Sequence, residues 1–238
     1  MKRDDATESP AEAGERPIKE DLAEPERRLV KIGFVSRIWG FLRRPPTTFR
    51  AIKEDTLSSA LKYALICLVI LGAAAGIVLA LLGPDVLFEL GLGELAGKLL
   101  SIPITIGLSI AGGMISLFVG GAWTHLWVKL LGGRHGCSYR QTLKALAYGA
   151  TPAYLLGWVP IVIFWGTDSI LATGLIGALI SIWPLVLTII GLRELHGITT
   201  GRAVVVYLLA TVIAALVAVS LLVAFIIHIL IYALTWPT

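Results

Sequence analysis

Residues 63–84 read YALICLVILGAAAGIVLALLGP, a run of 22 residues without Asp, Glu, Lys, Arg or His. Four further stretches lack these five residue types, namely 99–124, 145–167, 169–192 and 203–227. A membrane-spanning helix needs about 20 apolar residues to cross about 30 Å of hydrocarbon. Only 15% of the 238 residues are charged, whereas a soluble domain carries about 25%. The sequence therefore predicts an all-α integral membrane protein with five transmembrane helices.

The 20 Lys and Arg residues are distributed unevenly between the two sides of this membrane. Thirteen precede the first stretch, four lie in the second loop and two in the fourth, whereas only Lys98 lies on the opposite side. Basic residues in short loops remain cytoplasmic, so we expect the N-terminus in the cytoplasm and the C-terminus outside. Because the basic residues flank spans, the sequence pI of about 9.2 does not indicate a nucleic-acid-binding protein.

The composition divides the chain into three parts. Residues 1–28 are polar and rich in charge and proline. They cannot bury enough apolar surface to fold, so we expect a disordered cytoplasmic tail. Residues 29–59 are amphipathic, and residues 60–235 hold the five-helix transmembrane domain. The expected spans are about 60–83, 99–128, 142–165, 169–192 and 203–232.

The amphipathic part begins with an apolar stripe at helical spacing, flanked by basic residues, between residues 29 and 44. This pattern predicts an interfacial amphipathic helix that lies in the headgroup plane. The alternative is a helix docked on the cytoplasmic face of the protein itself, which would bury the same stripe. Pro45 and Pro46 end this helix. We expect a second amphipathic stretch, 47–60, to run into the first span.

Small residues recur at every fourth position in several spans, a spacing that lets helix backbones approach closely in membranes. They are Gly72 and Gly76, then Gly112, Ser116 and Gly120, then Gly149, Ala153 and Gly157. In the last span, alanine recurs in the same way at Ala210, Ala214 and Ala218. We expect such faces to pack helices together, either within the chain or between copies in a homo- or hetero-oligomer.

Prolines are the other unusual feature of the spans. Each of them removes one backbone hydrogen bond and bends its helix. Two interpretations follow: the bends open a cleft to lipid or to a small apolar ligand, or they serve packing shape alone. The candidate cleft comprises Pro152, Gly157, Trp158, Pro160, Trp183 and Pro184.

An enzyme within the membrane would have to place costly ionisable groups at depth. The five charge-free stretches contain no carboxylate, and His125 and His228 lie near the ends of their spans, where interfacial side chains are expected. His135 and Cys137 supply two zinc ligands, whereas a closed site needs four. We therefore expect no catalytic residue, no metal, no cofactor and no enzyme activity.

Several short motifs resemble the prokaryotic branch of the Ypt/Rab-interacting-protein family, whose members carry a Yip-one domain. The motifs are FLRRPPTTF at 41–49, ALKY at 60–63, SYRQTLKALAY at 138–148, GLRELHG at 191–197 and TGRA at 200–203. The resemblance covers about residues 38–232 and includes all five spans. No single motif is catalytic, so the resemblance rests on their order and spacing.

The resemblance implies a five-helix membrane domain with a cytoplasmic N-terminus. Eukaryotic relatives bind Rab-type GTPases, pair with each other and act in vesicle traffic between endoplasmic reticulum and Golgi, whereas prokaryotic members have no assigned activity. The acidic aromatic motif associated with GTPase binding is not evident in residues 1–59, so a small GTPase is a doubtful partner. The family branch indicates a prokaryotic cytoplasmic membrane, or an endomembrane if the source is eukaryotic.

We therefore expect a non-enzymatic membrane scaffold, in membrane organisation or trafficking, with a basic cytoplasmic surface. The candidate interaction cluster on that surface comprises Arg134, Arg140, Arg193, Glu194, His196 and Arg202. Arg193 and Glu194 should pair with each other or with Arg134 or Arg140. Anionic lipid headgroups or an acidic partner helix would bind such a cluster, whereas topology anchors and helix caps need no ligand. The alternative function is a small-solute or lipid transporter, or a lipid-binding protein, that uses the proline cleft.

Overall fold

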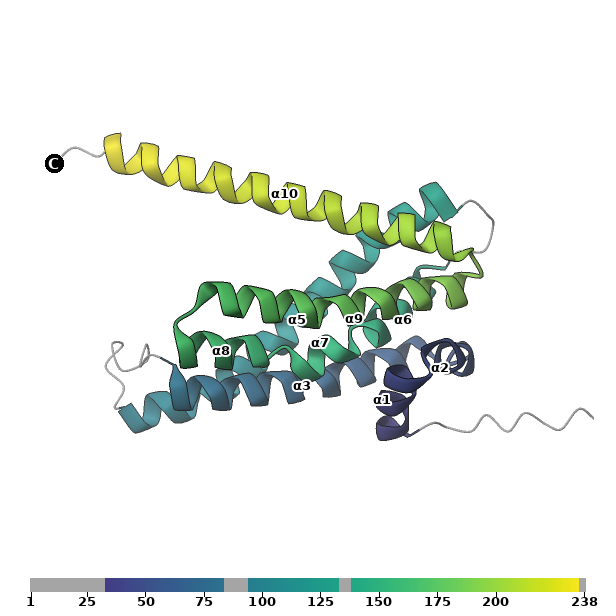
Figure 1. Ribbon diagram of the computed structural model, residues 1–238, viewed down its shortest axis with the longest axis horizontal. Helices are drawn as coiled ribbons and strands as arrows, with labels where there is room; N and C mark the ends of the chain where they lie inside the picture. The colour runs from purple at the N-terminus through teal and green to yellow at the C-terminus, as the bar shows by residue number, and fades with distance from the viewer. Residues whose placement is uncertain (1–32, 84–93, 133–137, 236–238) are drawn as a thin grey trace, which may run out of the picture. The chain divides into compact units, whose positions relative to one another are not determined.

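The computed structural model describes residues 33–83, 94–132 and 138–235 (Figure 1), and every regular element in these ranges is an α-helix. The elements are α1 (Phe34–Arg43), α2 (Pro45–Ala51), α3 (Leu57–Leu82), α5 (Glu94–Gly132), α6 (Tyr139–Gly149), α7 (Thr151–Leu156), α8 (Val159–Thr167), α9 (Ile170–His196) and α10 (Thr200–Thr235). The predicted tail at 1–28 and most of the first outer loop lie outside the described residues.

Five helical segments in the described ranges are long and apolar enough to cross a membrane. Four of them are the single helices α3, α5, α9 and α10, and the remaining one is the succession α6, α7 and α8. The predicted all-α fold with five transmembrane segments is confirmed, and the chain is an integral, multi-pass membrane protein. The helices extend a few residues beyond the charge-free stretches because polar residues near a membrane surface continue a helix without cost.

The third span is interrupted twice, and the prolines explain where. Pro152 lies in the first turn of α7, and Pro160 lies in the first turn of α8. A proline is tolerated there because the N–H groups of a first turn have no partner within the helix. The expected bends are therefore breaks between three consecutive helices in this span. By contrast, α9 continues through Pro184.

The first two spans meet at glycines, in a contact that we call the closed seam. A Cβ atom added at Gly72 would lie 2.6 Å from the Cα of Ile106 in α5. At Gly76, an added Cβ would lie 2.8 Å from the Cα of Ile102. Both distances are shorter than van der Waals contact, so only glycine allows the two backbones to approach in this way.

The small residues of the third span make contacts of different closeness. A Cβ atom added at Gly149 would lie 3.0 Å from the Cα of Thr188 in α9, which is again a backbone approach. At Gly157 the nearest atom outside its own helical turn is a methyl group of Leu71, at 3.2 Å from the added Cβ. Ala153, between them, is half-buried. Backbone contact in this span therefore depends on Gly149.

The expected packing of Gly112 and Gly120 is wrong within the described chain. A Cβ atom added at either position would meet no atom within 4 Å. The neighbouring Gly113 and Gly121 face leucine side chains of α3 and α6 instead. Consecutive helical residues point about 100° apart, since a turn holds about 3.6 residues. Each of the two sites is a Gly-Gly pair, so the four-residue spacing left two registers open, and the contacts within the described chain use Gly113 and Gly121.

The amphipathic segments form two short helices that pack on the spans. Phe41 of α1 and Phe49 of α2 are fully buried, and the Phe41 ring stacks on Tyr148 of α6 with centroids 5.3 Å apart. These contacts favour the docked alternative over a stripe that faces lipid. The second stretch does not run into the first span, because α2 ends at Ala51 and the Thr56 side chain caps a new helix.

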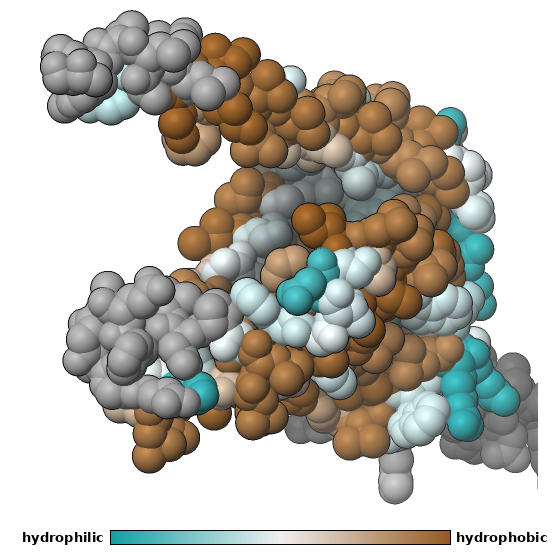
Figure 2. Space-filling view, turned by 60° about the vertical axis from the view of Figure 1, so that its left-hand side comes forward, coloured by the Kyte–Doolittle hydropathy of each residue, from teal (hydrophilic) through white to brown (hydrophobic). Residues whose placement is uncertain are grey.

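The last helix, α10, is in contact with its neighbours only near its beginning. Its buried residues are Ala203, Val206 and Ala210, which face α5 and α9. Beyond Ala210 almost every described side chain of α10 is exposed. Figure 1 shows that α10 separates from α9 toward the C-terminus. Figure 2 shows a recess between α10 and the other spans.

Candidate functional site

Polar side chains gather at one end of the described helices, which we call the basic end. It comprises α1, α2, the starts of α3, α6 and α10, and the ends of α5 and α9 (Figure 1). The short connections between consecutive spans bring these helix ends together, as in any antiparallel helix pair. All the candidate cluster residues that the structure describes are at this end.

Arg37 ties α1 to the spans. Its guanidinium lies 3.0 Å from Asp55 Oδ2 and donates hydrogen bonds to Ser59 Oγ at 3.1 Å and to Tyr148 Oη at 3.0 Å. The Tyr148 hydroxyl in turn donates to Asp55 at 3.0 Å. The Arg37 side chain is only 12% exposed. A guanidinium this buried, with several partners, holds the position of α1 and is not available to a ligand.

Arg50, Glu194 and Arg193 form a second polar group, which joins α2 to the end of α9. Arg50 donates to both carboxylate oxygens of Glu194, at 2.7 Å and 3.4 Å. Arg193 donates to the same carboxylate, with its Nε 3.0 Å from Oε1, and to Thr200 Oγ1 at 3.4 Å. The hydrogen bond to Glu194 raises the pKa of the Arg50 guanidinium above its ordinary value. Two guanidiniums and one carboxylate leave one net positive charge.

His196 belongs to a third group, which faces inward. The Thr142 hydroxyl lies 3.0 Å from His125 Nδ1 and 3.0 Å from His196 Nε2. It therefore bridges two imidazoles that sit on α5 and α9. The rings are 6.4 Å apart between centroids. One hydroxyl can donate to one ring and accept from the other when both histidines are neutral. The other nitrogen of His196, Nδ1, is buried and has no hydrogen-bond partner among the described residues.

The structure thus brings together only part of the predicted cluster. Arg193 and Glu194 pair with each other and with Arg50, which the sequence analysis had not selected. His196 is turned away from this pair toward Thr142. The remaining described members, Arg140 and Arg202, are exposed at the starts of α6 and α10, and Arg134 lies outside the described residues.

A cavity of about 370 Å³ lies between α5, the junction of α6 and α7, α9 and α10. Small residues of two helices border it, namely Gly113 and Gly120 of α5 and Ala210 and Ala214 of α10. Six hydroxyl-bearing residues also line it: Ser116, Thr124, Tyr154, Thr188, Tyr207 and Thr211. Figure 2 shows the recess beneath α10, the upper arm in that view.

The candidate proline cleft does not form as predicted. Of its six residues, Pro184 alone lines the cavity. Pro160 instead lies against α9, 3.9 Å from the Cβ position of Gly177. Trp158, which lies between α7 and α8, donates to the carbonyl of Leu155 in α7. Trp183 is exposed. Pro152 and Pro160 start successive helices of one span, whereas Pro184 lies inside α9, so the three prolines do not converge on one space.

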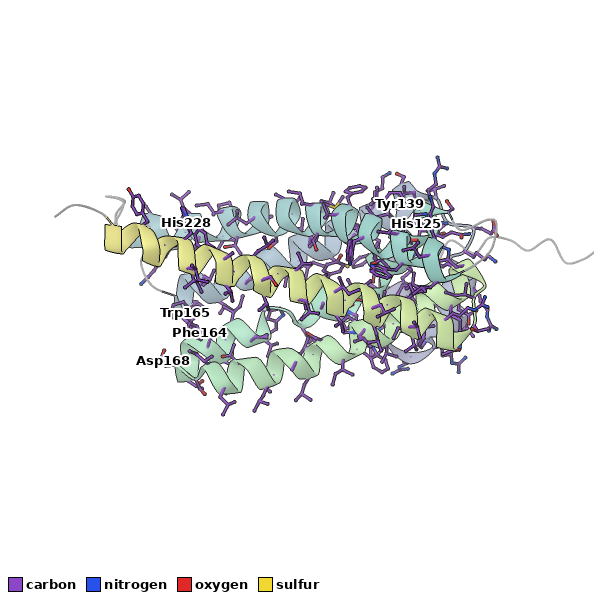
Figure 3. The ribbon with its side chains drawn as sticks, turned by 90° about the horizontal axis from the view of Figure 1, so that it is seen from above. His125, Tyr139, Phe164, Trp165, Asp168 and His228 are labelled. Carbon is purple, nitrogen blue, oxygen red and sulfur yellow. The ribbon has the colours of Figure 1, made fainter. Side chains whose placement is uncertain are left out.

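The two histidines singled out from the sequence do not approach one another. Figure 3 shows His125 and His228 at opposite ends of the described helices. His125 instead lies near His196. The sequence analysis missed this proximity because it depends on how α5 and α9 are placed. Within the described ranges, no group of three or more His, Cys, Asp or Glu side chains is arranged to hold a metal ion.

Comparison with known proteins agrees with this architecture. Residues 39–235, which include every described helix after the start of α1, match the family model of the Yip1 domain. No curated protein and no solved structure matches the sequence.

Proposed function

The chain belongs to the Yip1 domain family of multi-pass membrane proteins, and from this membership we propose that it is a non-enzymatic membrane scaffold that acts through its basic end. The observation that carries this proposal is the pair of polar groups at that end. Arg37 holds α1, and the Arg50–Glu194 pair holds α2, against the spans. The exposed bases around them therefore have defined positions, as a recognition surface requires.

The proposal places the basic end in the cytoplasm. Support comes from the distribution of Lys and Arg, 19 of 20 on the side of this end by the sequence count, because basic residues near spans remain cytoplasmic. The membrane is then a prokaryotic cytoplasmic membrane, or an endomembrane if the source is eukaryotic. The scaffold would serve membrane organisation or trafficking.

The partner that fits the basic end is an anionic group. Arg50 is 66% exposed although it is paired with Glu194, and Arg140 and Arg202 are exposed as well. Bases beside a membrane surface attract anionic lipid headgroups, at about 1 kcal/mol each, and they would equally attract an acidic partner helix. Nucleic acid and a small GTPase are not part of the proposal, because neither the charge pattern nor residues 1–59 carry their signatures.

Association between copies would use the lipid-facing side of α5. Gly72, Gly76 and Gly149 are already occupied by contacts within the chain. By contrast, Gly112 has open space around it and lies between the exposed side chains of Leu108 and Ile115. A small residue bordered by large ones is typical of helix–helix association in membranes.

Cross-linking followed by purification from native membranes tests the scaffold. We expect a stoichiometric protein partner with the unaltered chain, and less of it with the double variant Arg140→Glu and Arg202→Glu. Lys98→Glu, which reverses one charge at the opposite end of α5, is the control and should retain the partner. Recovery of no partner from any of the three would contradict the scaffold function.

A second candidate function, lipid or small-solute binding and transport, is favoured by one observation. The cavity between α5, α9 and α10 has a volume of about 370 Å³, within the range of about 300–1,000 Å³ typical of small-molecule sites. It replaces the proline cleft as the place where such a ligand would lie. In the purification experiment, a bound lipid or solute without a protein partner supports this candidate.

A further inference from the structure

The hydroxyl groups that line the cavity make no hydrogen bonds within the described parts of the chain. Three of them belong to buried residues: Thr124 is 4% exposed, Thr188 is 2% exposed and Tyr154 is 9% exposed. None of the three hydroxyls makes a hydrogen bond with any other described residue. Three more, on the half-buried Tyr207 and the exposed Ser116 and Thr211, likewise lack partners in the described parts of the chain. A hydroxyl without a partner costs free energy in the apolar part of a membrane.

Hydroxyls elsewhere in the spans behave differently. Those of Thr105, Thr173, Ser181 and Ser220 each lie 2.6–2.9 Å from the carbonyl oxygen four residues earlier in their own helix. A side chain that faces lipid satisfies itself in this way. Thr124, Thr188 and Thr211 also lie within helices, but their hydroxyls do not form this hydrogen bond. Their hydroxyls are therefore available to a group inside the cavity.

Small residues make the space for such a group. Gly113 and Gly120 on α5 and Ala210 and Ala214 on α10 leave a volume of about 370 Å³. This would accommodate about twelve water molecules at about 30 Å³ each. It also matches the polar end of a lipid better than a whole lipid, whose chains would leave through the recess beneath α10 (Figure 2).

The residues that line the cavity also indicate whether its ligand is charged. All the residues that border the cavity are uncharged, and its walls are mostly apolar. A phosphate placed there would have no cation to pair with, and a buried unpaired charge is far more costly than a buried ester. Hydroxyl donors match ester carbonyl oxygens, which are acceptors only. The chemistry therefore favours an uncharged ester over a phospholipid headgroup.

The depth of the cavity is consistent with an ester group. Thr124 precedes Lys129 by five residues, which is about 7.5 Å along α5 at about 1.5 Å per residue. Lys129 lies in the last turn of that helix, at the basic end. Molecules at the boundary between headgroups and acyl chains lie about 5–10 Å deep. The hydroxyls of Thr124 and Tyr207 are therefore near the level at which membrane lipids carry their esters.

We propose that this cavity binds the ester-linked glycerol of an uncharged, diacylglycerol-type lipid, with the hydroxyls as donors and the acyl chains leaving beneath α10. The inference rests on the second candidate function and specifies its ligand. Water alone, a phospholipid and the helix of a second copy are the other possible occupants, and the experiment below separates them.

The experiment uses the full chain in lipid nanodiscs and a diacylglycerol that carries a photoactivatable diazirine in one acyl chain. After illumination, mass spectrometry locates the labelled peptides. Gly120→Phe fills the cavity, and Gly107→Phe is a matched control. Both glycines lie on α5 with open space around the added Cβ, but only Gly120 borders the cavity. We expect labelling of the cavity segments of α5, α9 and α10 to fall at least about tenfold in Gly120→Phe and to persist in Gly107→Phe.

A second set of variants keeps the shape of the cavity and removes donors. Thr124→Val and Thr188→Val should each lower the labelling by roughly three- to tenfold, as expected for one lost hydrogen bond. Thr173→Val is the control, because that hydroxyl is bonded within its own helix, and labelling should not change. If Gly120→Phe does not fold, these valine variants still test whether the cavity binds the lipid.

Four results would overturn the proposal. They are absence of cavity labelling, equal labelling in the two Phe variants, equal labelling by a phosphatidylglycerol probe, and a cross-link between copies at α10 in place of the lipid. Lipid retention by the purified protein, measured by native mass spectrometry, separates this failure from that of the second candidate function. Retained lipid without cavity labelling refutes only the site, whereas no retained lipid refutes both.

Discussion

α5 contacts α3 on one side and α10 on another, and the two contacts differ in kind. In the closed seam with α3, Gly72 and Gly76 bring backbone against backbone. On the side of α10, Gly120, Ala210 and Ala214 border a cavity of about 370 Å³. Both sides have small residues at four-residue spacing. Such a spacing therefore permits close approach without enforcing it, and the course of the neighbouring helix decides whether the space is filled.

The largest expected effect comes from breaking the closed seam. Gly72→Leu would place a side chain where the Cα of Ile106 already lies. The helices would have to separate, so we expect a loss of about 3 kcal/mol in the free energy of unfolding. Denaturation of the purified protein by detergent titration measures it. Gly107→Leu, at an open position of α5, is the control, and equal losses in the two variants would show that the seam is not closed.

A smaller effect is expected at the basic end. There, polar side chains hold α1 against the spans, whereas the closed seam depends on glycine contacts. Arg37→Met removes the ion pair with Asp55 and two hydrogen bonds. We expect a loss of about 2 kcal/mol and faster proteolysis between α1 and α2. Arg43→Met, on the exposed side of the same helix, should change neither. If α1 stayed protected in Arg37→Met, its docking would depend on its apolar contacts, those of Phe34 and Phe41 above all.

Two tyrosines sharpen the comparison between the closed and open regions. Thr151 donates to the carbonyl of Tyr148, so the Tyr63 hydroxyl, 2.9 Å away, is the donor to Thr151. Tyr63→Phe should therefore cost about 1 kcal/mol. Tyr207→Phe in the cavity removes a hydroxyl with no partner among the described residues, and should cost nothing in lipid-free protein. Thermal unfolding of both variants in detergent checks this, and a larger loss at Tyr207 would contradict it.

The smallest expected effect is a gain in stability. Gly120→Ala adds a methyl group in open space and reduces the freedom of the unfolded chain, so the free energy of unfolding should rise by about 0.5 kcal/mol. Gly113→Ala should not show this gain, because the added Cβ would meet the Leu68 side chain. The same unfolding measurement compares them, and a gain at Gly113 would place the contact with α3 in the other register.

The sequence was sufficient for the spans and insufficient for the sites, for physical reasons. The free-energy cost of placing charged or unsatisfied polar groups in the bilayer applies to each segment separately. Charge-free stretches therefore predict transmembrane helices without knowledge of their neighbours. The polar groups at the basic end are different: Arg37 bonds Tyr148 across 111 residues, and Arg50 bonds Glu194 across 144. Such pairs depend on how the helices are placed together. For the same reason, the sequence left open whether the apolar stripe of α1 faces lipid or docks on the protein.

The sequence also did not show which glycine of each adjacent pair contacts a neighbouring helix. The pairs Gly112–Gly113 and Gly120–Gly121 each offer one glycine to a neighbouring helix and one to open space. The spacing between Gly112 and Gly120 is the same as that between Gly113 and Gly121, so spacing cannot distinguish the two faces. The sequence therefore predicted that α5 is a packing helix but could not predict which of its faces leaves a cavity.

The scaffold proposal requires the basic end to face the cytoplasm, and cysteine labelling tests that requirement most directly. In a chain without Cys67 and Cys137, Asp168→Cys and Arg202→Cys place single exposed thiols at opposite ends of the described helices, Arg202→Cys at the basic end. With a membrane-impermeant maleimide, we expect Asp168→Cys to be labelled in intact cells and Arg202→Cys only after permeabilisation. Labelling of Arg202→Cys in intact cells, with Asp168→Cys protected, would contradict the orientation and remove the basis of the scaffold proposal.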